Sequence, residues 1–205
     1  MRRTKEDAAL TKEQLLKAAL HSFHEKGYIA TSLDDIARAA GTTRGAVYWH
    51  FGSKAELFNA VVREQYTQAG IKLGPIYAQG GTMLETLRHI LVSWLSYAEE
   101  DRDFRTMLEL TTLQTGLLPE LADGIQGKKH STDLTIQGFA TMIGKGITAG
   151  EVRPEVNPEV TARMAVGLIY GITSTWLSDQ SAFSLKAQAA EMIDIFLRGI
   201  AQPEH

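Results

Sequence analysis

Three side chains that can carry a positive charge and one tyrosine lie between positions 44 and 54 of the 205-residue chain: Arg44, His50, Lys54 and Tyr48. An arginine in the first turn of a helix can donate two hydrogen bonds to guanine O6 and N7, and the other three side chains can donate to phosphates. Gly45 lets a backbone approach closely. At helical spacing Arg44 and Tyr48 form one row, whereas Val47 and Phe51 form a separate apolar row. The pattern indicates a helix with one row on a protein core and the other free to face DNA.

Two short helices separated by a glycine would position the row of Arg44 and Tyr48. Ser32-Leu33-Asp34-Asp35 is a variant capping box that predicts a helix to Ala40, and Gly41 closes it. Thr42 predicts the cap of a second helix that ends at His50 or Phe51. This is helix-turn-helix spacing, in which the second helix lies in the major groove and the first helix can meet a phosphate. The predicted DNA contacts are Ser32, Thr42, Thr43, Arg44, Gly45, Tyr48, His50 and Lys54.

The remaining apolar residues also recur at helical spacing, and no stretch alternates as a strand would, so the chain is predicted to be all-α with about nine helices. A first helix runs from Thr11 to Lys26 and ends at Gly27. Ser53 opens a fourth helix through a capping box with Glu56. We therefore expect a helix-turn-helix domain at 1–53 and a helical body at 54–205, with a joint at 70–81 because four glycines and a proline gather there.

Five more helices are predicted in the body. The fifth breaks at 99–101, the sixth spans Phe104 to Leu113, and Pro119 begins the next, over 120–149. Each interior glycine costs about 1 kcal/mol relative to alanine, so a break or a close helix contact is expected near 124–127. Asn157 followed by Pro158, and then Ser184, are start signals for the last two helices.

The charge divides along the chain. The total is −3, but residues 1–54 hold nine Lys and Arg against six Asp and Glu, or +3, which leaves −6 for residues 55–205. A basic segment beside an acidic remainder suits a nucleic-acid reader attached to another body. The chain has no cysteine, and we find neither a signal-peptide pattern nor a membrane-spanning run, so a cytoplasmic location is expected.

Other chemistries find less support. Each polar residue of the predicted DNA surface, taken alone, could be an ordinary solvated side chain. His21 and His24 stand at metal-ligand spacing on the first helix, but no third ligand is evident. There is no nucleophile elbow or phosphate loop. We therefore expect no enzyme activity, no metal and no cofactor.

The run from Thr11 to Val62, with TRGAVYWHF followed by SKAEL, resembles the DNA-binding region of TetR-family regulators almost position for position. The start RRTKEDA is similar to AcrR-type repressors of efflux pumps, and AGEVRPEVNPEVTA and YGITSTWL resemble that subgroup more loosely. The resemblance implies that Arg44 reads bases, that Thr43, Tyr48, His50 and Lys54 hold phosphates, and that Ser32 assists. It also implies a C-terminal body that binds a small ligand and dimerises, although the glycine-rich stretch 124–146 departs from the subgroup.

We thus predict a ligand-responsive repressor that binds a near-palindromic operator as a homodimer and is released by a hydrophobic or aromatic effector, with an efflux pump as its target. The predicted effector pocket is lined by Leu87, Ile90, Leu91, Trp94, Ile143, Val166 and Ile169. The predicted dimer contacts are Leu168, Ile172, Trp176, Met192, Ile193 and Phe196. Two alternatives stay open: a DNA-binding protein without an effector, and a small-molecule carrier or enzyme whose helix-turn-helix is incidental.

Overall fold

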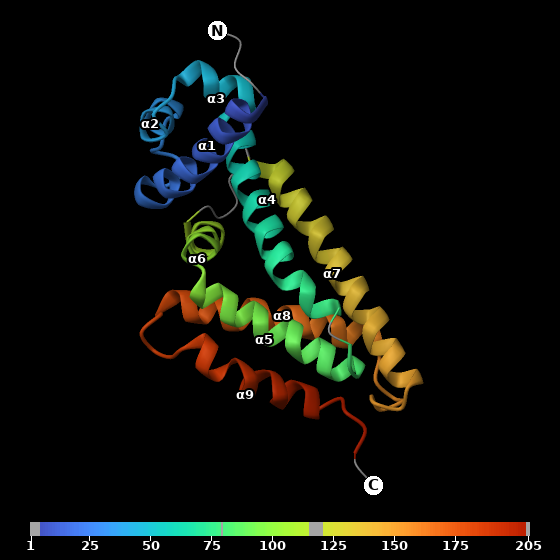
Figure 1. Cartoon of the computed structure of the whole chain (residues 1–205). Helices are drawn as coiled ribbons and strands as arrows, with labels where there is room; N and C mark the ends of the chain where they lie inside the picture. Colours follow the sequence, from blue (N-terminus) through green and yellow to red (C-terminus); the bar gives the residue numbers. More distant parts are fainter. Residues whose placement is uncertain (1–4, 79, 115–120, 204–205) are drawn as a thin grey trace. The chain divides into compact units, whose positions relative to one another are not determined.

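The computed structural model describes residues 5–78, 80–114 and 121–203, and the regular structure in these ranges is helical (Figure 1). The helices are α1 (Lys5–Lys26), α2 (Leu33–Ala39), α3 (Arg44–Phe51), α4 (Lys54–Leu73), η1 (Gly74–Ala78), α5 (Met83–Glu100), α6 (Arg102–Glu109), η2 (Leu110–Gln114), α7 (Ala122–Thr148), α8 (Pro158–Ser178) and α9 (Leu185–Arg198). The prediction of an all-α chain is confirmed.

Two compact units divide the chain. The first unit contains α1, α2, α3, all of α6 and most of α4. The second unit contains α5, α8, α9, the end of α4, and α7 beyond residue 125. The first unit packs around an aromatic cluster of Phe23, Tyr28 and Phe58, whose ring centroids lie 5.2 to 5.5 Å apart. Edge-to-face pairs at this separation are favourable, so the cluster fixes α1, its following loop and α4 to one another.

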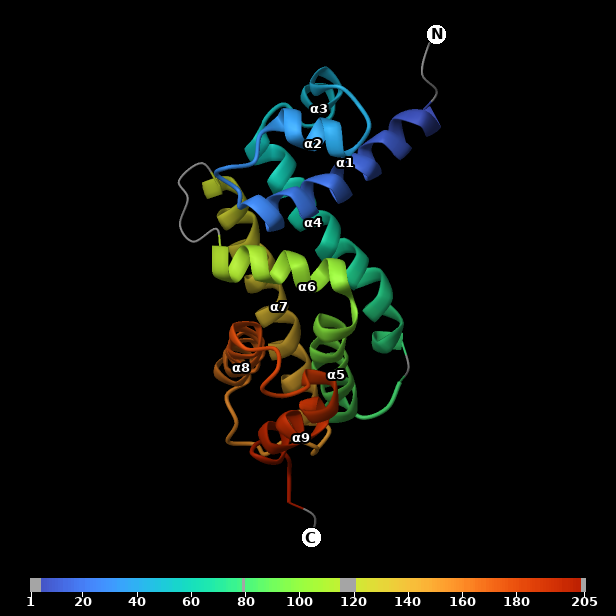
Figure 2. The ribbon, with the colours of Figure 1, turned by 90° about the vertical axis from the view of Figure 1, so that its left-hand side faces the viewer.

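Helix α6 belongs to the first unit through its contacts with α1 (Figure 2). His24 Nε2 lies 2.6 Å from a carboxylate oxygen of Glu109, and His21 Nε2 lies 3.5 Å from one of Asp103. The two histidines that sequence spacing placed on one face of α1 therefore each face a carboxylate of α6. Among the described residues no group of three His, Asp or Glu side chains is arranged to hold a metal ion.

Two predicted boundaries in the first half of the chain were wrong. Helix α1 begins at Lys5, because Thr11 is not a cap: its hydroxyl donates to the carbonyl oxygen of Asp7 at 2.7 Å, as threonine does inside a helix. Helix α4 continues through Gly70 to Leu73, so the predicted joint begins at η1 rather than at residue 70. One exposed glycine does not end a helix of this length.

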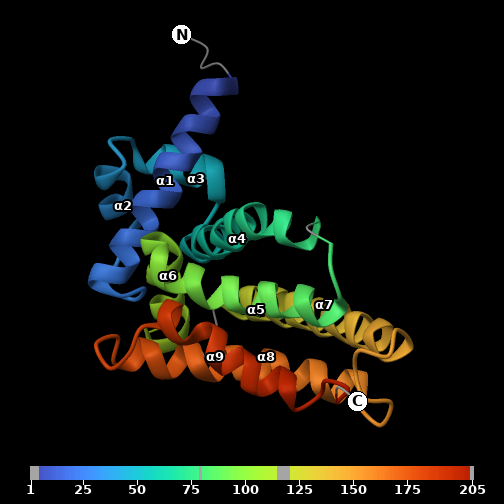
Figure 3. The ribbon, with the colours of Figure 1, turned by 60° about the horizontal axis from the view of Figure 1, so that its bottom comes forward.

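In the second unit α5 lies along α9, as Figure 3 shows. Leu87, Leu91 and Leu95 of α5 are buried in this contact layer, and Arg88 forms two hydrogen bonds with Asp194 of α9, at 2.6 and 3.1 Å. The predicted caps of α8 and α9 are confirmed. The Asn157 side chain accepts from the N–H groups of Glu159 and Val160, and the Ser184 hydroxyl accepts from that of Ala187.

The expected break near 124–127 was also wrong, because α7 runs without interruption from Ala122 to Thr148. The predicted start at Pro119 lies outside the described residues. The other expectation, a close helix contact near 124–127, concerns residues whose side-chain surroundings the structure does not describe. Close packing does occur at Gly146, where an added Cβ would lie 2.9 Å from Val152 Cγ2. Burial of Phe139 and Ile143 stabilises the helix by an amount of about the same size as the cost of its glycines.

Candidate nucleic-acid interface

The turn between α2 and α3 is built by the residues that the sequence pointed to, with one change of cap. Ser32 and Asp35 form a reciprocal capping box at the start of α2, and Gly41 adopts a positive φ of 64° after it. The hydrogen bond from Ser32 is the largest cause that lowers the pKa of Asp35. Helix α3 is capped by Thr43 rather than by Thr42, because the Thr42 N–H donates to the Ala37 carbonyl oxygen and closes α2.

Helix α3 has two distinct faces, as predicted. Val47 is fully buried and Phe51 is nearly so, which anchors the helix on the first unit. On the other side Arg44, Tyr48 and Trp49 are exposed, and we call these three residues the reading face. Trp49 is 75% exposed, so a large aromatic side chain stands in solvent on the helix predicted to enter the groove.

Arg44 is held in a defined orientation on the reading face. Its Nη1 donates to Asp34 Oδ2 at 3.0 Å and its Nη2 donates to the Tyr48 hydroxyl at 3.1 Å. The Cζ atom lies 5.4 Å from the centroid of the Tyr48 ring, a cation–π distance. The hydrogen bond with Tyr48, and then the charge of Asp34, raise the pKa of Arg44. The guanidinium is therefore fixed by two neighbours while remaining on the surface.

Lys54 is placed differently from a lysine that simply points into solvent. Its Nζ donates to the carbonyl oxygens of Tyr28, Ile29 and Thr31, at 3.0, 3.3 and 3.2 Å. It also lies 4.4 Å from the centroid of the Tyr28 ring. An ammonium has three N–H donors, so these carbonyls occupy all of them. A contact between Lys54 and a phosphate requires the side chain to leave the loop that it ties to α4.

The other predicted DNA contacts lie around the same two helices. Ser32 and Thr43 are exposed and use their side chains as helix caps, while Thr42 is half-buried in the turn. Gly45 is exposed, and an added Cβ would meet only Thr43 Oγ1, at 3.8 Å. The half-buried ring of His50 packs edge-to-face on Trp49, with centroids 4.5 Å apart.

Sequence reasoning missed two residues of this surface, Asp34 and Trp49. The sequence analysis treated Asp34 only as part of the capping sequence, and it assigned Trp49 neither to the core nor to the DNA contacts. No local signal pointed to position 34, because its partner Arg44 stands ten positions further along the chain. For Trp49 the signal was its offset from Val47 and Phe51, which places it away from the buried row.

The residues predicted to line an effector pocket come from α5, α7 and α8, and six of the seven are buried. They are Leu87, Ile90, Leu91, Ile143, Val166 and Ile169, with Trp94 half-buried. Helices α5 and α8 are in contact within the second unit. Six of the seven residues are thus interior apolar side chains of that unit.

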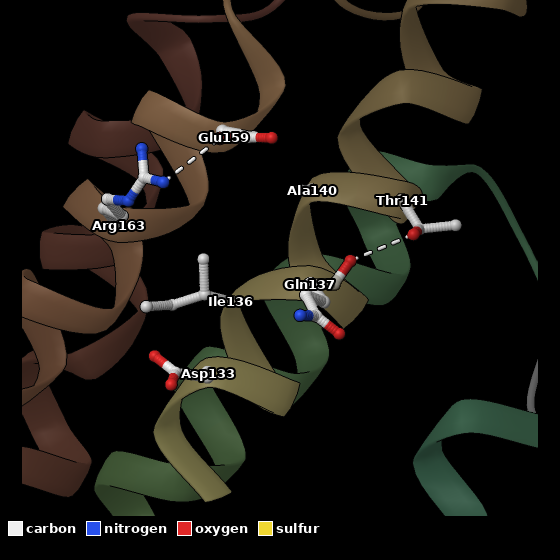
Figure 4. A pocket seen from close by; sticks show the side chains of 7 residues that line it. All are labelled: Asp133, Ile136, Gln137, Ala140, Thr141, Glu159 and Arg163. Atoms are coloured by element: carbon white, nitrogen blue, oxygen red, sulfur yellow. Dashed lines mark hydrogen bonds and ion pairs between the residues drawn. The ribbon is translucent and has the colours of Figure 1, made fainter. Parts of the chain in front are cut away.

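A separate surface cleft of about 420 Å³ lies between α7 and α8 (Figure 4). Its lining includes Asp133, Gln137 and Thr141 of α7 and Glu159 and Arg163 of α8, and shares no residue with the predicted pocket. Ile136 points from α7 towards α8, and Arg163 is paired with Glu159 at 3.0 Å. The cleft is mostly polar, in contrast to the buried apolar set.

The predicted dimer contacts divide by burial. Trp176 and Ile193 are buried inside the second unit, where the Trp176 indole donates to the Phe183 carbonyl oxygen at 3.1 Å. These two side chains therefore support α8 and α9 from within and offer no surface to a partner. The remaining four are half-buried: Leu168, Ile172, Met192 and Phe196.

Taken together, a capped two-helix turn, a buried row on α3 and an exposed row with a fixed arginine define a helix-turn-helix DNA-binding unit joined to a helical body. The model of bacterial regulatory proteins of the tetR family matches residues 15–61, and that of the C-terminal region of MAATS-type transcriptional repressors matches residues 82–201. The chain belongs to the TetR family and is a transcriptional regulator with a repressor-type C-terminal region. The resemblance found in the sequence is thereby confirmed.

Relatives match along almost the whole chain. The HTH-type transcriptional regulator AcrR of Shigella flexneri is 29% identical over 197 residues, which cover 96% of this chain and 92% of that protein. The crystal structure of NalD, the secondary repressor of the MexAB-OprM multidrug efflux pump in Pseudomonas aeruginosa, is 28% identical, covers 98% of this chain and all of its own, and has a TM-score of 0.84.

A structure of SmeT in complex with triclosan is 25% identical to this chain, covers 93% of it and 91% of its own chain, and has a TM-score of 0.81. SmeT is the repressor of the SmeDEF multidrug efflux pump of Stenotrophomonas maltophilia. In the part of this chain that the structure describes, no helix has the length and hydropathy needed to cross a membrane.

Proposed function

We propose that this protein is a repressor that binds a near-palindromic operator as a homodimer and leaves it when a hydrophobic small molecule binds the C-terminal body. The observation that carries the DNA-binding part is the orientation of Arg44 on the reading face, held by Asp34 and Tyr48 at 3.0 and 3.1 Å. An arginine at this place in a second helix reads guanine in the major groove. Binding of operator DNA places the protein in the cytoplasm.

A selection of bound fragments from random duplex DNA tests this part directly, because it gives the half-site and its spacing together. Arg44→Ala should then weaken binding to the selected duplex by about 1 to 3 kcal/mol and relax the preference at one base pair per half-site. Lys12→Ala, an exposed change on α1, is the control for loss of one positive charge. Equal losses for Arg44→Ala on the selected and on a scrambled duplex would count against base reading.

For the effector, we propose the buried apolar set of α5, α7 and α8 as the binding region, and efflux-pump genes as the target. The named relatives that regulate multidrug pumps support the target, and the triclosan complex of SmeT supports an apolar aromatic ligand class. The absence of any charged side chain from the set of seven also suits such ligands. A gene for a pump next to that of this protein would agree with the proposal.

Two matched substitutions separate the buried set from the α7/α8 cleft. Val166→Phe adds side-chain volume within the buried set, and Ile136→Phe adds it in the cleft. With triclosan as the probe, release of the wild-type protein from its selected duplex should be abolished by Val166→Phe and kept by Ile136→Phe. The reverse pattern would move the effector to the polar cleft. Thermal unfolding of both variants without triclosan shows whether either one has lost its fold.

We propose that the dimer forms through the exposed sides of α8 and α9. Met164 is 58% exposed and Ile195 is 59% exposed, although both are apolar. On α8 nothing lies within 4 Å of a Cβ added at Gly167 or Gly171, so a second helix can approach the backbone there. Leu168 and Ile172 flank these glycines, and on α9 Met192 and Phe196 flank Ile195. A two-fold dimer offers two reading faces to half-sites about 34 Å apart.

As a functional division we propose that residues 1–53 read DNA and that residues 54–205 bind the effector and dimerise, with the helix after Ser53 connecting them. The compact units place α6 with α1, so a helix of the proposed effector domain contacts the DNA-binding region directly. An effector then needs to favour the conformation that does not bind DNA by about 1.4 kcal/mol for each tenfold loss of operator affinity.

A further inference from the structure

Asp34 stands on the surface that the proposed function assigns to DNA, yet its charge has the same sign as that of the phosphates. It is the second residue of α2, and its side chain is 53% exposed, beside an Arg44 side chain that is 55% exposed. Asp34 is not part of the capping box, which uses Ser32 and Asp35. Its place in the first turn of α2 suits the helix dipole, and its carboxylate accepts a hydrogen bond from Arg44 of the next helix.

We infer that Asp34 is a specificity-determining positioning residue, which aims the Arg44 guanidinium at a base and keeps it from the phosphates. The inference rests on the proposed reading of operator DNA by Arg44 and extends it to a residue that makes the reading selective. Asp34 acts through Arg44, so it is a positioning residue and needs no contact with DNA of its own.

The donor geometry of Arg44 allows this role. A guanidinium has five N–H groups, and a bidentate contact with guanine uses two of them. Asp34 takes one from Nη1 and Tyr48 takes one from Nη2, which leaves one N–H on each of these nitrogens and the one on Nε. The fork can thus stay bound to both neighbours while it donates to a base. Because its plane is fixed before binding, little rotamer freedom is left to lose on a guanine.

The charge of Asp34 also favours contact of Arg44 with a base over contact with a phosphate. Non-specific binding depends on contacts between cations and phosphates, so a carboxylate 3.0 Å from Arg44 opposes the use of that arginine as a phosphate contact. A guanine edge is neutral and offers two acceptors in a fixed geometry. The carboxylate therefore opposes binding of Arg44 to guanine less than it opposes binding of Arg44 to a phosphate. Asp34 is therefore expected to lower affinity for unrelated DNA while it supports affinity for the operator.

A different role would give the opposite sign on the operator. If Asp34 only occupied Arg44 in the free protein and had to be displaced by DNA, its removal would strengthen binding to every duplex. The two hydrogen bonds of the guanidinium favour the positioning role, because Tyr48 orients Arg44 from its own helix at the same time. If Asp34 only blocked Arg44 until DNA displaced it, the second hydrogen bond, from Arg44 to Tyr48, would not be needed to orient the guanidinium plane.

The test uses the full-length protein, the duplex that the wild-type chain selects from a random library, and a scrambled duplex of equal length. Asp34→Ala should lower the ratio of the two affinities about tenfold, with weaker binding to the selected duplex and stronger binding to the scrambled one. Asp34→Asn, which keeps the side-chain size, should lower the ratio less. Glu13→Gln removes an exposed carboxylate of α1 and is the matched control for charge, with the ratio unchanged.

The double variant Asp34→Ala with Arg44→Ala shows whether the effect passes through Arg44. Its affinity ratio should equal that of Arg44→Ala alone, because no guanidinium is left to position. An unchanged ratio in Asp34→Ala, or an equal gain of affinity on both duplexes, would overturn the inference. If instead the wild-type chain enriches no sequence from the library, the proposed reading of operator DNA fails, which is a separate outcome.

Discussion

Lys54 and Arg44 are both cations of the DNA-binding unit, but their surroundings give them different roles. Arg44 is oriented on the surface by one aspartate and one tyrosine, whereas the Lys54 ammonium faces three carbonyl oxygens at the end of the loop after α1. Sequence spacing assigned both residues to DNA. It could not separate their roles, because the direction of a side chain is set by partners that are distant in the chain. Tyr28 and Thr31 lie more than twenty positions before Lys54, so this role could not be read from its neighbours.

Lys54→Met should therefore destabilise the protein and not only weaken its contact with DNA. The change keeps the apolar stem and leaves the carbonyl oxygens of Tyr28, Ile29 and Thr31 without their shared charged donor, a cost of about 1 to 3 kcal/mol. Urea unfolding followed by circular dichroism measures it. Lys12→Met, on the exposed side of α1, should change stability by less than about 0.5 kcal/mol. If both variants are equally stable while Lys54→Met alone lowers the salt slope of DNA binding, Lys54 serves as a phosphate contact only.

At the scale of the helices, the sequence predicted several caps correctly but not the helices that pack against one another. Asn157, Ser184 and Ser32 cap where expected, because the donor and acceptor of a cap lie within three residues of each other. The continuous α7 was not predicted, since the cost of its glycines is offset by burial of side chains such as Phe139 and Ile143, which depends on the rest of the fold. The buried face of a helix gives no information on which helix covers it, so the placement of α6 on α1 could not be derived from its apolar pattern.

The start of α9 depends on a residue of α5. The Glu99 carboxylate accepts from the Lys186 backbone N–H at 2.6 Å and from the Ser184 hydroxyl at 2.9 Å, next to the positive end of the helix dipole. Glu99→Leu should destabilise the protein by about 1 to 2 kcal/mol, because it removes the charge and leaves the Lys186 N–H unsatisfied. Thermal unfolding measures this loss. The neighbouring Glu100 makes an exposed ion pair with Lys186, so Glu100→Gln should have little effect.

The pair of Arg88 and Asp194 joins α5 to α9 and predicts a dependence on pH. The hydrogen bonds from Arg88 hold the pKa of Asp194 below its ordinary value of 3.8. A carboxylate whose pKa is lowered by folding stabilises the protein above that ordinary value, and this contribution is lost as the pH falls through the lower pKa of the folded state. The side chains are 35% and 37% exposed, so solvent screening limits the contribution to about 1 kcal/mol.

Asp194→Asn should therefore lower the free energy of unfolding at pH 7 by no more than this amount, and its difference from the wild type should shrink as the pH falls below 3.8. Urea unfolding of the wild-type and variant proteins across this range gives the comparison, with stability curves that converge at low pH. Glu159→Gln, which removes the more exposed pair with Arg163, should leave the curve of the wild type nearly unchanged. Parallel curves for Asp194→Asn and the wild type would show that the pair makes no contribution linked to pH.

At the scale of the whole molecule, the division of charge and the helix-turn-helix motif predicted a DNA reader joined to a different body, and both family models agree with it. The effector region stays a prediction, because an apolar stripe is the same in a packed core as in a ligand pocket. For the dimer, burial sharpens the sequence prediction by removing Trp176 and Ile193 from the surface. Of the predicted contacts, Leu168, Ile172, Met192 and Phe196 remain half-buried on α8 and α9. The exposed apolar side chains of Met164 and Ile195 lie on the same two helices.

If the dimer uses these exposed sides, a charge placed there should separate the subunits without unfolding them. In the free subunit Ile195→Glu and Met164→Glu stay in solvent, so the fold should survive, whereas in a dimer each charge loses its hydration. Light scattering after size exclusion should give about half the mass of the wild type. Operator affinity should fall steeply at the same protein concentration, because one subunit holds one half-site. Leu134→Glu, at a 54% exposed apolar position of α7, is the control, and a full-mass dimer for both test variants would place the interface elsewhere.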